Sequence, residues 1–207
     1  MSNKIQNLLK QAELQAKTTT PQESSVTCAS RTFSNDAEAE NFFDKLKQKL
    51  LRIKEWSAKS GLSSYELFDE NGKLSHRKQA IIGDFIRITL HGSGKNDWVK
   101  ILNVYASPDE IVLTVKPFFD PTEKEPDKDV TSHFFTSEAT NNFCVERKGK
   151  TINFCVIGLN EKTNTDETKG FVETVRNFAT ANIGSYFGIQ KSEWKTFCEN
   201  FLETKEK

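Results

Sequence analysis

Hydrophobic and polar positions alternate in most segments between residues 26 and 159, which predicts a series of β-strands. The first segment, VTCASRTFS at residues 26–34, is rich in strand-forming residues. Six more segments follow, at Tyr65–Phe68, Phe85–Leu90, Trp98–Tyr105, Ile111–Phe118, Phe143–Arg147 and Ile152–Leu159. The breaks carry turn residues, such as Asn71-Gly72, Pro108-Asp109 and Gly149, and most are too short for a parallel crossover. The pattern therefore predicts an antiparallel meander.

Two other regions carry apolar residues at helical spacing. After Asn35 and Glu38, which have the spacing of a capping box, one helical face collects Ala39, Phe42, Phe43, Leu46, Leu50 and Ile53. We expect this helix to end before Gly61. A second stripe, from Phe171 to Phe187, predicts a long C-terminal helix, and Ser192 would begin an extra short helix over residues 192–203.

The order of these elements predicts one α+β domain over residues 26–207. Strands and helices do not alternate along the chain, and the long helix needs an apolar surface that only the sheet can supply. We therefore expect a curved antiparallel sheet of about six to seven strands gripping the C-terminal helix (helix-grip). Residues 1–25 are expected to form a flexible polar tail, in which Ile5, Leu8, Leu9 and Ala12 could make a short, loosely docked helical stripe.

This order resembles the helix-grip fold of the START-related superfamily, which includes lipid-transfer START domains, plant pathogenesis-related allergens and aromatase/cyclase-like proteins. The resemblance rests on VTCASRTFS, the helix DAEAENFFDKLKQKL that follows it, the segment EWSAKSGL, the meander, and the helix from Glu167. It covers residues 26–190 and consists of element order and length. It implies a cavity between the sheet and the C-terminal helix that binds apolar or amphipathic ligands.

Charge and composition exclude several classes of function. The 29 basic and 29 acidic residues balance, so the basic excess typical of nucleic-acid binding is missing. No segment approaches the roughly 20 apolar residues that span a bilayer, and the N-terminus lacks a signal-peptide core, so we expect a cytoplasmic protein. The cysteines are Cys28, Cys144, Cys155 and Cys198. A Cys144–Cys155 disulfide is possible, although buried free thiols are the expectation for a cytosolic chain.

The segment HGSGKND at residues 91–97 invites comparison with a phosphate-binding loop. The motif needs a glycine where Thr89 stands and a Ser or Thr where Asn96 stands, and a strand-like run follows instead of a helix. We interpret the segment as a hairpin turn. No cofactor or metal is expected, because His76, His91 and His133 have no second ligand at metal-binding spacing.

Four polar or aromatic residues are the candidates for a ligand site. Strand alternation places Asn103 and Tyr105 on one face with Val99 and Ile101, and places Arg147 on the inner face of its strand with Phe143. Trp56 follows the first helix and would close the cavity mouth.

These side chains could recognise the polar group of a bound lipid or other amphipathic small molecule in a non-enzymatic binding module. The alternatives are an interaction or structural domain with a filled core, and, third, a cyclase- or hydrolase-like enzyme on the same fold. No catalytic constellation is visible for the last.

Overall fold

The structure is a computed structural model that describes residues 3–18, 23–60, 63–90, 96–124, 135–162 and 183–203. One sheet contains seven strands in the order β1-β7-β6-β5-β4-β3-β2. The strands are β1 Ser24–Thr32, β2 Ser63–Phe68, β3 Phe85–Leu90, β4 Asn96–Ala106, β5 Glu110–Pro117, β6 Thr140–Lys148 and β7 Thr151–Leu159. Every neighbouring pair is antiparallel. The α+β class and the antiparallel sheet are thus confirmed, and β1 forms one sheet edge beside β7.

The hairpin interpretation of HGSGKND agrees with the strand pairing. Thr89 at the end of β3 pairs with Asn96 at the start of β4, so the segment joins two adjacent antiparallel strands. Residues 91–95 lie outside the described residues. The element after them is a strand, whereas a phosphate-binding loop opens a helix.

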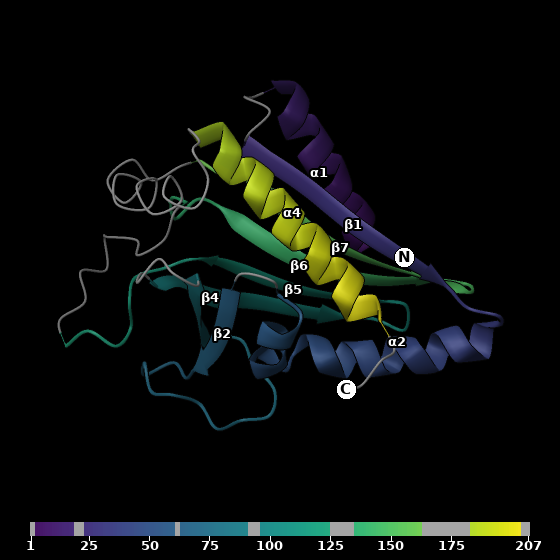
Figure 1. Ribbon diagram of the computed structural model, residues 1–207, viewed down its shortest axis with the longest axis horizontal. Coiled ribbons are helices and arrows are strands. Elements are labelled where there is room, and N and C mark those ends of the chain that lie inside the picture. The colour runs from purple at the N-terminus through teal and green to yellow at the C-terminus, as the bar shows by residue number, and fades with distance from the viewer. Residues whose placement is uncertain are drawn as a thin grey trace.

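Three helical segments pack on the inner, concave face of the curled sheet (Figure 1). Helix α2 spans Asp36–Leu50 and begins with the predicted capping box, because the Glu38 amide donates to Asn35 Oδ1 at 2.9 Å. It ends before the 3-10 helix η2, Ile53–Ala58. Helix α4 spans Ile183–Leu202 and crosses β1 and β7.

The C-terminal helix differs from the prediction in its bounds. Helix α4 is continuous across Ser192, so the separate helix expected over residues 192–203 is its second half. In this second half, Phe197, Cys198, Phe201 and Leu202 all enter the inner core. The predicted helical stripe before residue 183 lies outside the described residues.

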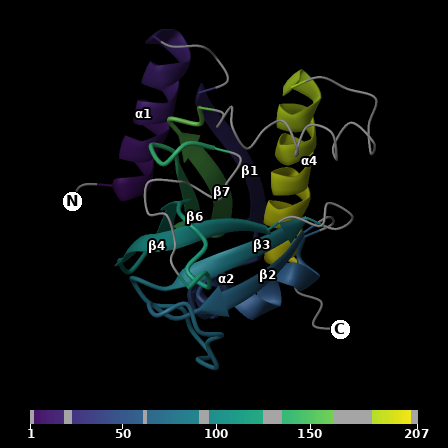
Figure 2. The ribbon, with the colours of Figure 1, turned by 90° about the vertical axis from the view of Figure 1, so that its left-hand side faces the viewer.

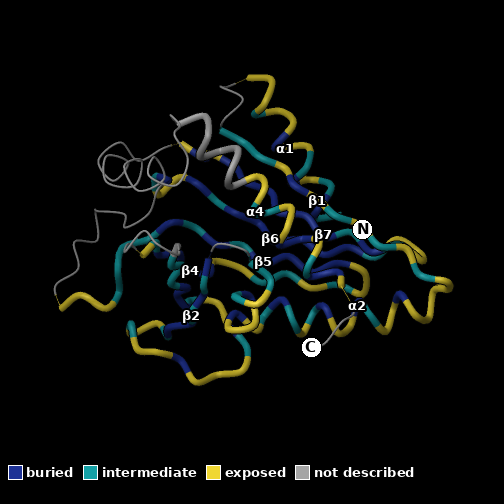
Figure 3. Tube along the Cα trace, viewed as in Figure 1, coloured by how far each residue is buried: buried dark blue, intermediate teal, exposed yellow. Residues whose placement is uncertain are grey.

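The N-terminal segment is not the flexible tail that its polarity predicted. Residues Lys4–Thr18 form helix α1, which packs on the outer face of the sheet, opposite α4 (Figure 2). Ile5, Leu8 and Ala12 are buried, which is the stripe visible in the sequence. The outer faces of β5, β6 and β7 carry apolar side chains that need a cover, and α1 supplies it. Buried residues therefore run along the strands between two helical layers (Figure 3).

Strand β4 contains an irregularity that reverses its two faces. Ile101 pairs with Val115 while Asn103 pairs with Thr114, so Leu102 is an extra residue in a β-bulge. Val99 and Ile101 lie on the inner face before the bulge, and Val104 takes the inner position after it. Each residue beyond Leu102 therefore lies on the face opposite to that expected from simple alternation.

Candidate functional site

The structure does not bring the four sequence-predicted site residues together. Because of the bulge, Asn103 and Tyr105 lie on the outer face of the sheet. Asn103 is exposed. Tyr105 is half-buried and packs against the cluster that α1 covers.

Trp56 lies deep in the inner core, where its side chain is 1% exposed. Its indole Nε1 donates to the Leu50 carbonyl at 3.1 Å, so its polar atom is satisfied. Ring centroids of Phe143, Phe197 and Tyr65 lie 4.6, 5.3 and 5.5 Å from that of Trp56. Trp56 therefore organises a packed aromatic cluster.

Arg147 has the inner-face register predicted for it, two residues beyond the buried Val145. Its guanidinium bonds Asp109, in the β4–β5 turn, with an Nη2–Oδ1 distance of 2.6 Å. This ion pair holds Arg147 at the sheet end, and the sequence pattern gave no indication of it. The Arg147 guanidinium is therefore already paired with a protein group.

A group of polar residues lies at the end of the inner face away from Arg147, and we call it the polar notch. Ser25, Gly158 and Asn141 are register partners across β1, β7 and β6, in the same inward orientation as Val156 and Phe143. The carboxyl group of Glu161 folds back over Gly158, since a Cβ at position 158 would overlap it. Glycine leaves the space that the carboxyl group occupies.

The turn after β7 holds Glu161 in this position. Asn160 adopts the left-handed conformation with φ 53°, which Asn tolerates better than most residues, and reverses the chain. The Glu161 amide then donates to the Glu23 carbonyl at 2.9 Å. On the outside, Gln15 of α1 donates to Asn160 Oδ1 at 2.6 Å. These bonds hold the backbone of the turn that carries Glu161.

Glu161 is a buried acid with one of its two carboxyl oxygens unpaired. The residue is 1% exposed, and Asn141 Nδ2 donates to its Oε1 at 2.9 Å. Its Oε2 has no hydrogen-bond partner in the structure. Burial raises the pKa of Glu161, while the nearby Ser25 hydroxyl and the hydrogen bond from Asn141 oppose that shift. The raised pKa favours the neutral acid, which can donate a proton from Oε2.

A second unpaired donor lies near the same end of the inner face. Trp194 of α4 packs against Phe143, with ring centroids 5.5 Å apart, and Phe143 is two residues from Asn141 on the same face. The Trp194 indole Nε1 is shielded from solvent and also has no partner in the structure. Such groups are uncommon in native interiors.

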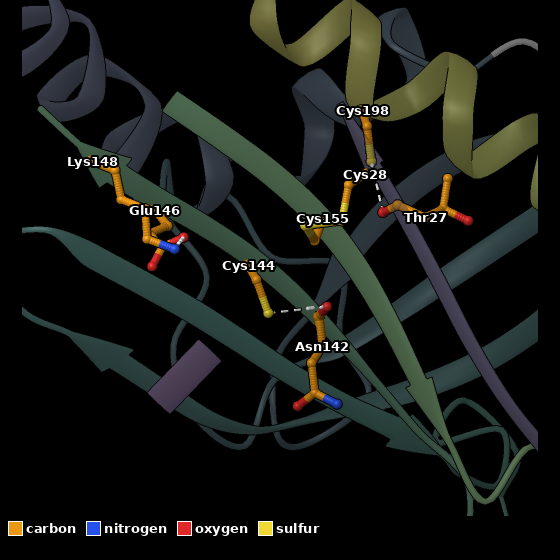
Figure 4. The surroundings of a disulfide bond; sticks show 8 residues. All are labelled: Thr27, Cys28, Asn142, Cys144, Glu146, Lys148, Cys155 and Cys198. Atoms are coloured by element: carbon orange, nitrogen blue, oxygen red, sulfur yellow. Dashed lines mark hydrogen bonds and ion pairs between the residues drawn. A yellow bond between two sulfur atoms is a disulfide. The ribbon is translucent and has the colours of Figure 1, made fainter. Parts of the chain in front are cut away.

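The outer face carries a row of cysteines on three adjacent strands. Cys155 of β7 is the register partner of Cys28 on β1 and of Cys144 on β6. Cys28 and Cys155 form a disulfide, with their Cα atoms 4.1 Å apart, and Cys144 is a buried free thiol (Figure 4). The possible Cys144–Cys155 pair is therefore replaced by Cys28–Cys155. The sequence placed Cys144 and Cys155 on neighbouring strands, but it did not show that β1 would return beside β7.

A pocket of about 270 Å³ opens beside this disulfide, between α1 and the sheet. All three cysteines line it, together with Ile5 of α1 and Lys148 of β6. Burial raises the pKa of the Cys144 thiol, and the carboxylates of Glu110 and Glu146 add to the shift. Among the described residues, no group of acidic, cysteine or histidine side chains is arranged to hold a metal ion.

No model of a protein family and no curated protein matches the chain. Solved structures do match. The hypothetical protein jhp0584 from Helicobacter pylori has a TM-score of 0.52 at 7% identity, over 86% of each chain. Major latex-like protein 151 from Panax ginseng has a TM-score of 0.42 at 12% identity, over 87% of this chain and 99% of its own. Protein Ms6760 from Mycobacterium smegmatis has a TM-score of 0.40 at 11% identity, over 90% and 94%.

The sheet topology and the likeness to the Helicobacter pylori protein establish the fold, a helix-grip arrangement of a curled antiparallel sheet and a C-terminal helix. At 7% identity, that likeness extends to the fold alone. None of the described helices is long and apolar enough to cross a membrane.

Proposed function

We propose that this protein is a non-enzymatic binding module for an amphipathic small molecule or lipid, held between the inner face of the sheet and α4. The observation that carries the proposal is the Glu161 carboxyl group, which is buried, unpaired at Oε2 and shifted by burial toward the neutral form. A buried polar atom without a partner costs about 1–3 kcal/mol, and a ligand oxygen would offset that cost.

The chemistry of the unpaired atoms selects the ligand's polar group. Protonated Glu161 and the Trp194 indole are both donors, so the complementary group is an acceptor oxygen such as a carbonyl, ether or hydroxyl. The apolar part would contact rings of the inner face, of which Phe143 and Phe197 lie next to Trp194. Few polar groups in an otherwise apolar lining are typical of small-molecule sites. Asn103 and Tyr105 lie on the opposite face of the sheet, and Arg147 is paired with Asp109. Trp56 shares the ring neighbours Phe143 and Phe197 with Trp194, but its own N–H is already bonded.

Native mass spectrometry of the full chain, purified without denaturant, tests the proposal first. We expect a non-covalent adduct that is lost on denaturation. Nile red, a neutral apolar dye with a carbonyl oxygen, then serves as the probe in a fluorescence titration. Trp194→Phe keeps the ring and removes the N–H, so it should weaken binding by about 2- to 12-fold, the equivalent of one net hydrogen bond of about 0.5–1.5 kcal/mol.

Trp98→Phe is the matched control. Its indole nitrogen is also buried and unpaired, but Trp98 packs with Phe68 and Phe85 on the outer face of β2–β4. The control variant should bind Nile red like the wild type. Equal weakening by both substitutions, or no saturable binding to the wild type, would contradict an inner-face site.

The alternative of an interaction domain with a filled core retains one specific observation in its favour. The rings of Tyr65, Phe143, Phe197 and Phe201 all pack against Trp56, which leaves that part of the interior occupied. The same mass spectrum separates the two functions, since an interaction domain would be recovered without a small-molecule adduct. A cytoplasmic location stays a prediction, and the disulfide is a feature more common in oxidising compartments.

A further inference from the structure

The three outer-face cysteines form a donor–acceptor series for thiol–disulfide exchange. Cys155 is central, since it is the register partner of both Cys28 and Cys144. Directly opposite residues of antiparallel strands have Cα atoms about 4.5–5.5 Å apart, which is within the range of about 4.4–6.8 Å that a disulfide spans. Cys28 is exposed, whereas Cys155 and Cys144 are 7% and 1% exposed.

We propose that this row is an exchange site, in which the Cys144 thiol displaces Cys28 from Cys155 and so presents Cys28 as a modifiable thiol in the pocket under α1. The site is on the opposite face of the sheet from Glu161 and does not depend on ligand binding there.

The exchange balances without any outside oxidant or reductant. Cys144 loses its proton to water, and its sulfur forms a bond to Cys155 Sγ. The Cys28–Cys155 bond breaks, its electron pair leaves on Cys28 Sγ, and Cys28 takes a proton from water. Because the row runs straight across β6, β7 and β1, the leaving sulfur lies on the far side of Cys155 from the attacking one.

Helix α1 covers Cys144 and so limits how often this exchange can occur. Cys144 belongs to the buried cluster formed with Ile5, Leu8 and Ala12 of α1, and its Sγ is 3.5 Å from the Asn142 carbonyl that it donates to (Figure 4). Burial disfavours the thiolate that must attack. Exchange therefore proceeds when α1 opens, and it leaves the exposed member of the row, Cys28, as the free thiol.

Trapping with iodoacetamide tests the proposal on the full oxidised chain. Before exchange, the free thiols Cys144 and Cys198 are both buried. We expect the reagent to accumulate on Cys28, in molecules whose peptide map shows a Cys144–Cys155 disulfide after acid quenching. The variant Cys144→Ser should keep the Cys28–Cys155 disulfide and lose the Cys28 label.

Cys198→Ser is the matched control, because Cys198 is a buried free thiol on the inner side, facing the Thr27 carbonyl. It should be labelled at Cys28 like the wild type. A label on Cys144 with Cys28–Cys155 intact, an unlabelled wild type, or equal labelling of the Cys144→Ser variant would overturn the proposal.

A second variant keeps the test independent of Cys144→Ser folding. Cys28→Ser, treated with oxidised glutathione as the oxidant, should form the Cys144–Cys155 disulfide. If both thiols persist although circular dichroism shows a folded protein, the row cannot exchange and the proposal fails.

Discussion

The fit between Gly158 and Glu161 gives the sharpest test of the inner-face notch. In Gly158→Ala the new Cβ occupies the place of the Glu161 carboxyl group, so the carboxyl group must leave. Its departure breaks the 2.9 Å bond from Asn141 Nδ2 and leaves that buried amide unpaired. The loss is about 1–3 kcal/mol. Replacing a strand glycine with alanine returns about 0.5–1 kcal/mol. The expected net loss of unfolding free energy is therefore at most about 2.5 kcal/mol.

In a protein that already carries Glu161→Ala, the effect of Gly158→Ala on the free energy of unfolding should change sign. Without the carboxyl group there is no overlap and no bond to break, so Gly158→Ala should then stabilise by about 0.5–1 kcal/mol. Urea unfolding of the wild type, both single variants and the double variant gives the four free energies of a cycle. Additive effects of the two substitutions would refute the placement of Glu161 over Gly158.

Three further outcomes follow from named contacts. The pKa of Glu161 is raised in the folded state, so its contribution to stability is present below the unfolded carboxyl pKa and is lost as pH rises through the folded pKa. The midpoint of urea unfolding should therefore fall over this pH range. The Glu161→Gln variant should show a weaker dependence of the midpoint on pH. Leu8→Ala, at a buried α1 position, should cost about 2–5 kcal/mol in urea unfolding and speed iodoacetamide labelling of Cys28. Asn35→Ala removes the α2 cap and should cost about 0.5–2 kcal/mol, near the lower end because Asn35 is exposed, as measured by thermal unfolding with circular dichroism.

The fold could be predicted from the sequence because the alternation of hydrophobic and polar residues, the turn residues and the Asn35 capping box all act locally. From β2 to β7 each strand pairs with the next strand along the chain, so this part of the order follows the sequence. The pairing of β1 with β7 is non-local, and with it the Cys28–Cys155 disulfide, whose cysteines are 127 residues apart.

The candidate site was less readable, for a reason that Leu102 illustrates. A single inserted residue in β4 moved Asn103 and Tyr105 to the outer face, and nothing in WVKILNVY distinguishes a bulged strand from a regular one. Glu161 follows β7 in a polar stretch that resembles an ordinary loop. Gly158 was the available signal, because a glycine inside an apolar strand often marks a close approach.

Strands β1 and β7 carry both the cysteine row and part of the polar notch, so the disulfide also affects how firmly the inner-face residues of β1 are held. Ser25 and Gly158 of the notch lie three residues along the same strand pair from Cys28 and Cys155. As the edge strand, β1 is hydrogen-bonded only to β7 within the sheet, so transfer of the disulfide to Cys144 leaves β1 without a covalent link. Hydrogen-exchange mass spectrometry should then show faster exchange of β1 amides in oxidised Cys28→Ser than in oxidised Cys144→Ser. Equal exchange would mean that α4 and β7 hold β1 without help from the disulfide, and that the two faces work independently.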